Sequence, residues 1–232
     1  MLKDQKISLV IPCLNEAQAL PGLLERIPEG ITEVMVVDNG STDGSADVAR
    51  KYSATVITED VKGYGSALLR GIAHAQGDII ALLDADGTYS IQDLTDLLIL
   101  METDHLDLIS GCRFPLVDPA AMPLANTLAN HFISWFISVQ FRINIKDSQS
   151  GLIIFKRNLL DKITIKNKGM GFSQEIKIKA WLQPDVRCTE KHIHYKVRIG
   201  KSNFNGIKDA LKNLFALITV HKGLRLGRGN NW

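Results

Sequence analysis

The sequence predicts an α/β fold with a mostly parallel central sheet flanked by helices. Short runs of apolar, often β-branched residues recur about 20 to 30 residues apart, which is the spacing of βα units. Segments with helical periodicity lie between these runs. The runs themselves carry few polar residues, which is typical of parallel strands that helices cover on both faces. Together these three observations favour a doubly covered sheet over an all-α or all-β fold.

Five apolar runs in the first half of the chain are predicted strands. Each is four or five residues long and ends at polar or glycine residues, as buried strands do. We expect right-handed crossovers between parallel neighbours. The predicted buried strands are residues 7–11, 34–37, 55–58, 79–83 and 106–110.

Apolar residues spaced three and four positions apart predict helices between these strands, over residues 17–27, 66–76 and 91–101. After about residue 115 the pattern changes. That half is predicted to contain helices at 124–141, 172–182 and 206–221, and strands at 151–155, 186–188 and 193–197. Because no glycine- or proline-rich linker and no repeat interrupts the pattern, residues 1–232 are predicted to form one domain.

The composition excludes several classes of protein. The chain has 232 residues, 45% of them hydrophobic and 22% charged, so it can bury a large core and does not resemble a disordered protein. No apolar run reaches the roughly 18 residues that span a bilayer, and the N-terminal apolar run is too short for a signal peptide. Three widely separated cysteines without zinc spacing favour a reducing cytosol.

The net charge of +2 conceals a basic C-terminal region. From Lys191 onward nine lysines and arginines face a single acidic residue, Asp209. Such a region suggests an anionic partner, which charge alone leaves open between a membrane surface, nucleic acid and phosphate.

Polar or glycine residues follow four of the five predicted strands, at residues 12–16, 38–44, 84–88 and 111–113. Ligands of open parallel sheets bind at this carboxyl edge. Asp84 and Asp86 come one residue apart directly after a buried strand, so their carboxylates are candidate ligands of Mg²⁺ or Mn²⁺. The first strand is followed by neither GxGxxG nor GxxxxGK, which argues against a dehydrogenase or a P-loop NTPase.

These strand-end motifs resemble those of family 2 GT-A glycosyltransferases, and most of all the dolichol-phosphate or polyprenyl-phosphate mannosyl- and glucosyltransferases. The resemblance covers about residues 6–205. It rests on eight motifs in order: LVIPCLNE at 9–16, VVDNGSTDG at 36–44, KGYGSA at 62–67, DAD at 84–86, GCR at 111–113, DSQSG at 147–151, GFSQE at 171–175 and RIGKS at 198–202.

The resemblance implies a GT-A (Rossmann-like) fold and a metal-dependent, inverting transfer of a hexose from a nucleotide-sugar. Residues 1–115 would form the nucleotide-sugar-binding half, 116–205 the acceptor half, and 206–232 a basic amphipathic helix and tail. Asp84 and Asp86 would hold Mg²⁺ or Mn²⁺. Asn39 stands where mannosyl enzymes often carry a second acidic residue, which leaves the nucleotide open between UDP and GDP. The implied nucleotide-sugar-binding residues are Pro12, Leu14, Glu16, Asp38, Lys62, Gly63, Asp84, Ala85 and Asp86.

The implied acceptor is a polyprenyl or dolichyl phosphate. A phosphomonoester has its second pKa near about 6, so it is mostly dianionic at neutral pH and attacks without a general base. It needs cations instead, and Arg113, Arg198 and Lys201 are the candidates beside the catalytic Asp86.

Two alternatives remain open. A hydroxyl acceptor would need a base, for which Glu175 is the candidate. The second alternative is an inactive scaffold that binds a nucleotide-sugar, although the intact pair Asp84 and Asp86 argues against it.

The apolar faces of helices 124–141 and 206–221 indicate a peripheral position at the cytoplasmic, inner face of a membrane, although packing in the core would explain either face equally well. That position leaves room for a membrane-embedded partner subunit, and nucleic acid is not an expected partner.

Overall fold

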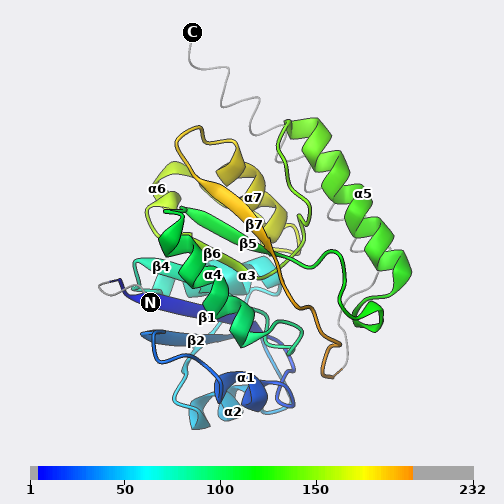
Figure 1. Ribbon diagram of the computed structural model, residues 1–232. Coiled ribbons are helices and arrows are strands. Elements are labelled where there is room, and N and C mark those ends of the chain that lie inside the picture. The colour runs from blue at the N-terminus through cyan, green and yellow to red at the C-terminus, as the bar shows by residue number, and fades with distance from the viewer. Residues whose placement is uncertain (1–4, 201–232) are drawn as a thin grey trace.

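The computed structural model describes residues 5–200, which build one seven-stranded sheet between helices (Figure 1). The strand order is β3-β2-β1-β4-β6-β5-β7. β6 runs antiparallel to both of its neighbours and every other pair is parallel, so the predicted mostly parallel sheet is confirmed. The strands are β1 (Ile7–Cys13), β2 (Glu33–Asp38), β3 (Thr55–Thr58), β4 (Ile79–Leu82), β5 (Leu108–Cys112), β6 (Ile153–Lys156) and β7 (Cys188–His192).

Helices cover both faces of the sheet. Alternation along β1 sends Leu9 and Ile11 into a core with α1, α2 and α4, and sends Val10 into a second core with α3, α6 and α7. The helices are α1 (Leu20–Leu24), α2 (Ser45–Lys51), α3 (Tyr64–His74), α4 (Ile91–Thr103), the short 3₁₀ helix η1 (Pro119–Ala121), α5 (Leu124–Phe141), α6 (Leu159–Lys162) and α7 (Phe172–Trp181).

The long helix α5 forms an outer layer and has the predicted bounds. Its Ile133 and Ile137 pack against Ile178 of α7 rather than against the sheet (Figure 1). Among residues 5–200, α5 is therefore covered on one side, and its other side faces away from them.

The register brings the carboxyl ends of β1, β2 and β4 to one edge of the sheet. Cys13 at the end of β1 pairs with Asp38 at the end of β2, and Val10 pairs with Leu82 at the end of β4. The loops that follow these strands consequently share one edge, as predicted for ligand binding in such a sheet.

Three predicted strands differ from the structure. The predicted strand at 186–188 reaches only the first residue of β7 (Cys188–His192). Residues 55–58 form the edge strand β3 and are half-exposed rather than buried, because no strand within residues 5–200 pairs with their outer side. Residues 193–197 make only one isolated bridge, between Tyr195 and Tyr89, since the chain leaves the sheet there and crosses the end of β4. The backbone N–H groups of Lys196 and Ile199 donate to the carbonyls of Thr88 and Asp86.

Candidate active site

The loops after β1 and β2 are locked together by side chains. Asn15 donates its backbone N–H to Ser41 Oγ (2.9 Å) and accepts from the N–H of Thr42 (2.8 Å). The N–H of Glu16 donates to Ser45 Oγ (2.9 Å). The Asp38 carboxylate accepts from the N–H of Ser41 (3.0 Å). This interlock fixes the segment that carries Pro12, Leu14 and Glu16 beside Asp38.

Asn39 fixes a third loop next to them. Its amide donates to the carbonyls of Glu59 (2.8 Å) and Val61 (2.9 Å) and accepts from the N–H of Gly63 (2.8 Å). The ammonium of Lys62 donates to the Asn39 carbonyl (2.9 Å). Lys62 and Gly63 therefore lie beside the end of β2, and the Asn39 side chain is used for structure rather than for reading a nucleotide.

Asp84 and Asp86 lie at the end of β4 in different surroundings. Asp84 Oδ1 accepts from the phenol of Tyr64 (2.8 Å). Burial and then the charge of Asp86 raise the pKa of Asp84 to about 7, against the lowering effect of the Tyr64 hydrogen bond. Asp86 Oδ1 accepts from the N–H (3.1 Å) and hydroxyl (2.6 Å) of Thr88, so Thr88 fixes its rotamer.

Arg198 joins the far end of the described chain to these carboxylates. One guanidinium nitrogen donates to Asp86 Oδ2 (2.6 Å), and another donates to Glu16. Burial raises the pKa of Glu16 to about 7, and the charge of Arg198 opposes that rise. The structure thus brings together Glu16, Asp86 and Arg198, which the sequence assigned to separate motifs. The predicted partner Lys201 and the helix at 206–221 lie outside the described residues.

The carboxylate pair fits a hard divalent cation. Mg²⁺ and Mn²⁺ are typically bound by one or two carboxylates together with substrate phosphates and water. The described residues offer Asp84 and Asp86 but contain no cluster of three or more histidine, cysteine or acidic side chains that could hold a metal without substrate. A guanidinium already lies against Asp86 Oδ2, which shows that this position accommodates positive charge.

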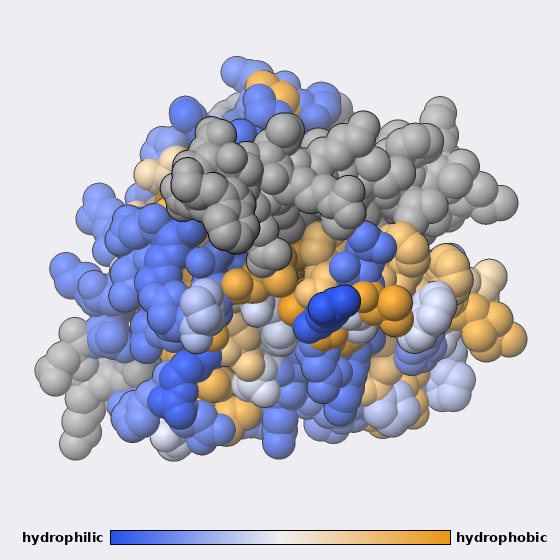
Figure 2. Space-filling view, turned by 90° about the horizontal axis from the view of Figure 1, so that it is seen from above, coloured by the Kyte–Doolittle hydropathy of each residue, from blue (hydrophilic) through white to orange (hydrophobic). Residues whose placement is uncertain are grey.

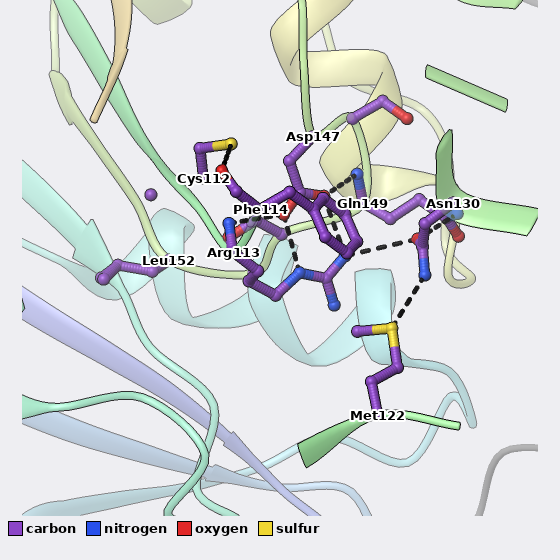
Figure 3. A network of polar contacts seen from close by, with 12 residues as sticks. Cys112, Arg113, Phe114, Met122, Asn130, Asp147, Gln149 and Leu152 are labelled. Carbon is purple, nitrogen blue, oxygen red and sulfur yellow. Dashed lines mark hydrogen bonds and ion pairs between the residues drawn. The ribbon is translucent and has the colours of Figure 1, made fainter. Parts of the chain in front are cut away.

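Arg113 is held at the end of β5 by Asp147 (Figure 3). Its backbone N–H, Nε and Nη2 donate to the fully buried Asp147 carboxylate at 2.8–2.9 Å, and Nη2 also reaches Asn130 of α5 (3.3 Å). Burial alone would raise the pKa of Asp147, but Arg113 outweighs it and lowers that pKa to about 2. Figure 3 shows the remaining Nη1 directed away from Asp147, and no residue in the described range 5–200 accepts from it.

Glu175, the candidate base, is buried near the start of α7 and is occupied by structural contacts. Its Oε2 accepts from the N–H groups of Lys166 (3.0 Å) and Asn167 (2.7 Å). Its Oε1 accepts from the ammonium of Lys179 (2.5 Å). These contacts hold residues 166–169 in place against the start of α3, where the N–H of Ser66 donates to the Lys168 carbonyl (3.0 Å).

The family model described as Glycosyl transferase family 2 matches residues 8–163, more than half of the chain. The chain belongs to this family. The resemblance seen in the motifs is therefore confirmed.

Similar proteins agree with this assignment. The low-salt glycan biosynthesis hexosyltransferase Agl6 of Haloferax volcanii is 30% identical over 92% of this chain, which spans 54% of Agl6. A dolichyl-phosphate hexose transferase of the same organism is 29% identical, with 86% of each protein covered. A glucosyl-3-phosphoglycerate synthase from Mycobacterium tuberculosis, solved with Mn²⁺, UDP-glucose and phosphoglyceric acid, is 18% identical, with a TM-score of 0.77 over 94% of this chain and 80% of that one. At that identity the likeness shows the fold, so the GT-A prediction is confirmed.

Sequence reasoning missed four residues that shape this glycosyltransferase site. Tyr64, Tyr89, Asp147 and Gly151 contact Asp84, Arg113 or one another, yet none was assigned a role. Three of them fall inside the recognised motifs, at 62–67 and 147–151, so their presence there was the available signal. Tyr89 follows the DAD motif by three residues and carried no signal of its own.

Proposed function

We propose that this family 2 glycosyltransferase moves a hexose, with inversion, from a UDP- or GDP-linked donor to a polyprenyl or dolichyl phosphate. The observation that carries the proposal is that carboxylates and guanidinium groups both lie at one edge of the sheet. The carboxylates of Asp84 and Asp86 suit a metal and a donor diphosphate. Arg198, and Arg113 two strands away, supply guanidinium groups that suit a phosphate acceptor.

The donor assignment is supported by the loops around the ends of β1 and β2. Pro12, Leu14, Glu16 and Asp38, with Lys62 and Gly63, are the residues that we propose to bind the nucleotide. The interlock described above holds these loops rigid before substrate arrives, which lowers the entropy cost of binding. UDP-glucose in the structural neighbour favours a UDP-linked donor over a GDP-linked one.

A divalent cation bound by Asp84 and Asp86 would neutralise charge that develops on the leaving diphosphate. To make room, Arg198 must release Asp86 Oδ2. We propose that its guanidinium then turns to a phosphate, so that one side chain balances Asp86 in the free protein and an anion in the complex. Gly200, at φ +85°, lets the backbone bend next to this residue.

The acceptor assignment is supported by Arg113. Asp147 fixes its Nε and Nη2 and leaves Nη1 for a ligand, while the rings of Phe114 and Tyr195 lie 5.6 and 5.2 Å from its Cζ. A guanidinium held in this way loses little freedom when it binds phosphate. The dolichyl-phosphate hexose transferase among the relatives favours a lipid phosphate.

Helix α5 offers a surface that suits a membrane. It has no acidic or basic residue other than His131, and Figure 2 shows apolar surface on the side of the molecule where α5 lies, at the right of the view. Such a patch is rare on a monomer without a binding partner, and Trp and Phe are favoured at a bilayer interface. No helix within residues 5–200 is long and apolar enough to cross a membrane. Five outward side chains are each 59–73% exposed: Leu124, Leu128, Phe132, Trp135 and Val139.

The test is a panel of donors and acceptors. The protein is incubated with Mn²⁺ or Mg²⁺ and UDP- or GDP-hexoses, with polyprenyl phosphate in anionic vesicles, with the unphosphorylated polyprenol, and with no acceptor. We expect a glycosylated lipid phosphate from one donor and none from the alcohol. Glycosylation of the alcohol would favour a hydroxyl acceptor, and no product from any donor would favour a scaffold.

Glu175→Gln is expected to keep substantial activity, within about tenfold of the parent, because a phosphate dianion needs no base and Gln still accepts from residues 166 and 167. Loss of a general base would instead cost about 10²–10⁴-fold. The measurement is the initial transfer rate across a pH series. Lys179→Met is the control, since it breaks the same ion pair and leaves the carboxylate in place. A collapse of turnover in Glu175→Gln alone, with the fold intact, would assign the base role to Glu175.

A further inference from the structure

The Asp84 carboxylate lies against both a phenol and a bare backbone. The phenol of Tyr64 donates to Oδ1. Gly151 lies beside this hydrogen bond, where an added Cβ would be 2.6 Å from Asp84 Oδ2 and 2.8 Å from the Tyr64 hydroxyl oxygen. Any side chain at position 151 would therefore displace the carboxylate or the phenol.

Gly151 is itself held by the loop that carries the aspartates. Its N–H donates to the hydroxyl of Tyr89 (2.7 Å), and the buried Tyr89 ring meets Tyr195 edge to face with centroids 5.4 Å apart. Tyr89 belongs to the same loop as Asp86. The Gly151 backbone beside Asp84 is thus fixed relative to Asp86.

Tyr64 is fixed from the opposite half of the chain. It begins α3, and the next residue, Gly65, lies so close to residues 167–169 that an added Cβ would be 2.3 Å from the Asn167 carbonyl oxygen. Glu175 holds the same segment by two hydrogen bonds. Packing and hydrogen bonds from α7 therefore determine where the Tyr64 hydroxyl lies.

We propose that Tyr64 is a positioning residue for the metal-binding carboxylate Asp84, and that the bare backbone of Gly151 leaves the space this contact needs. The phenol hydrogen bond and the close approach of Gly151 restrict rotation of the carboxylate, so its orientation is set before a cation would bind. A carboxylate free to rotate would lose entropy on binding metal, and groups that hydrogen-bond to ligands typically contribute about 10–100-fold to metal affinity. This inference rests on the metal role in the proposed function.

The experiment measures Mn²⁺ binding directly, from the electron paramagnetic resonance signal of free Mn²⁺ titrated with the protein, with and without UDP or GDP. We expect Tyr64→Phe to bind Mn²⁺ about tenfold more weakly than the parent. Tyr52→Phe is the matched control, because it removes a phenol hydrogen bond to the Glu25 carboxylate (2.8 Å) on the surface, before the start of β3 and so away from the carboxyl edge of the sheet. That control should bind like the parent.

Three further variants complete the experiment. Gly151→Ala leaves the phenol in place but intrudes on Asp84, so it should also weaken Mn²⁺ binding, and it replaces Tyr64→Phe as the test if that protein fails to fold. Asp84→Asn and Asp86→Asn should abolish binding. Unchanged binding in both aspartate variants would overturn the metal role itself. Loss in the aspartate variants with parental binding in Tyr64→Phe, or in Gly151→Ala, would overturn the positioning role alone.

Discussion

Asp86→Asn is expected to reduce the transfer rate at least about a hundredfold while the fold survives. Asparagine keeps an oxygen that accepts from Thr88, so the loop retains its shape. It lacks the negative charge that pairs with Arg198 in the free protein and that would bind the proposed divalent cation. The measurement is the initial rate of hexose transfer with saturating Mn²⁺, beside a thermal unfolding curve.

The control for this substitution is Asp96→Asn, which changes an exposed carboxylate on α4 that accepts a side-chain hydrogen bond from Gln92. It should transfer hexose at the parental rate. Excess EDTA should reproduce the loss caused by Asp86→Asn. Full activity in EDTA, or in Asp86→Asn itself, would contradict metal-dependent catalysis.

Arg198→Ala is expected to lower kcat/KM about ten- to a hundredfold. Hydrogen bonds to charged groups contribute about 1.5–3 kcal/mol each, and about 1.4 kcal/mol is a tenfold change in rate. Arg198→Lys should recover only part of the loss, because an ammonium cannot bridge Asp86 and Glu16, or a phosphate, as a planar guanidinium does. The measurement is steady-state kinetics with donor and acceptor varied in turn.

A second measurement separates a functional role of Arg198 from a structural one. Because the guanidinium lies against Asp86 Oδ2, its removal should strengthen Mn²⁺ binding to the nucleotide-free protein even as transfer falls. Arg50→Ala, which breaks an exposed Arg–Asp pair on α2, is the control and should change neither quantity. The loop 198–202 would be no more than an exposed basic surface if three variants all kept the parental kinetics: Arg198→Ala, Arg198→Lys and Lys201→Ala.

Most strands could be predicted because a buried strand is a short run of apolar residues, which is a local property of the sequence. A run such as residues 79–83 has no polar residue, so it belongs inside, and the change to Asp84 marks where it reaches the edge. α5 was predicted with its observed bounds because residues 124–141 are rich in apolar side chains and poor in charge, which is a local property of the sequence. β7 and residues 193–197 were misplaced because strand pairing at the edge of a sheet depends on distant partners.

By itself, the sequence determined the family, the sheet and the strand-end residues, because short motifs and hydrophobic periodicity are local properties of the chain. Only the tertiary structure decided what those residues touch. It placed Arg198 between Glu16 and Asp86, Tyr64 on Asp84, and Asp147 on Arg113. It also turned Glu175 toward residues 166 and 167. These contacts join residues from distant parts of the chain, and the direction of a side chain depends on packing that no single segment encodes.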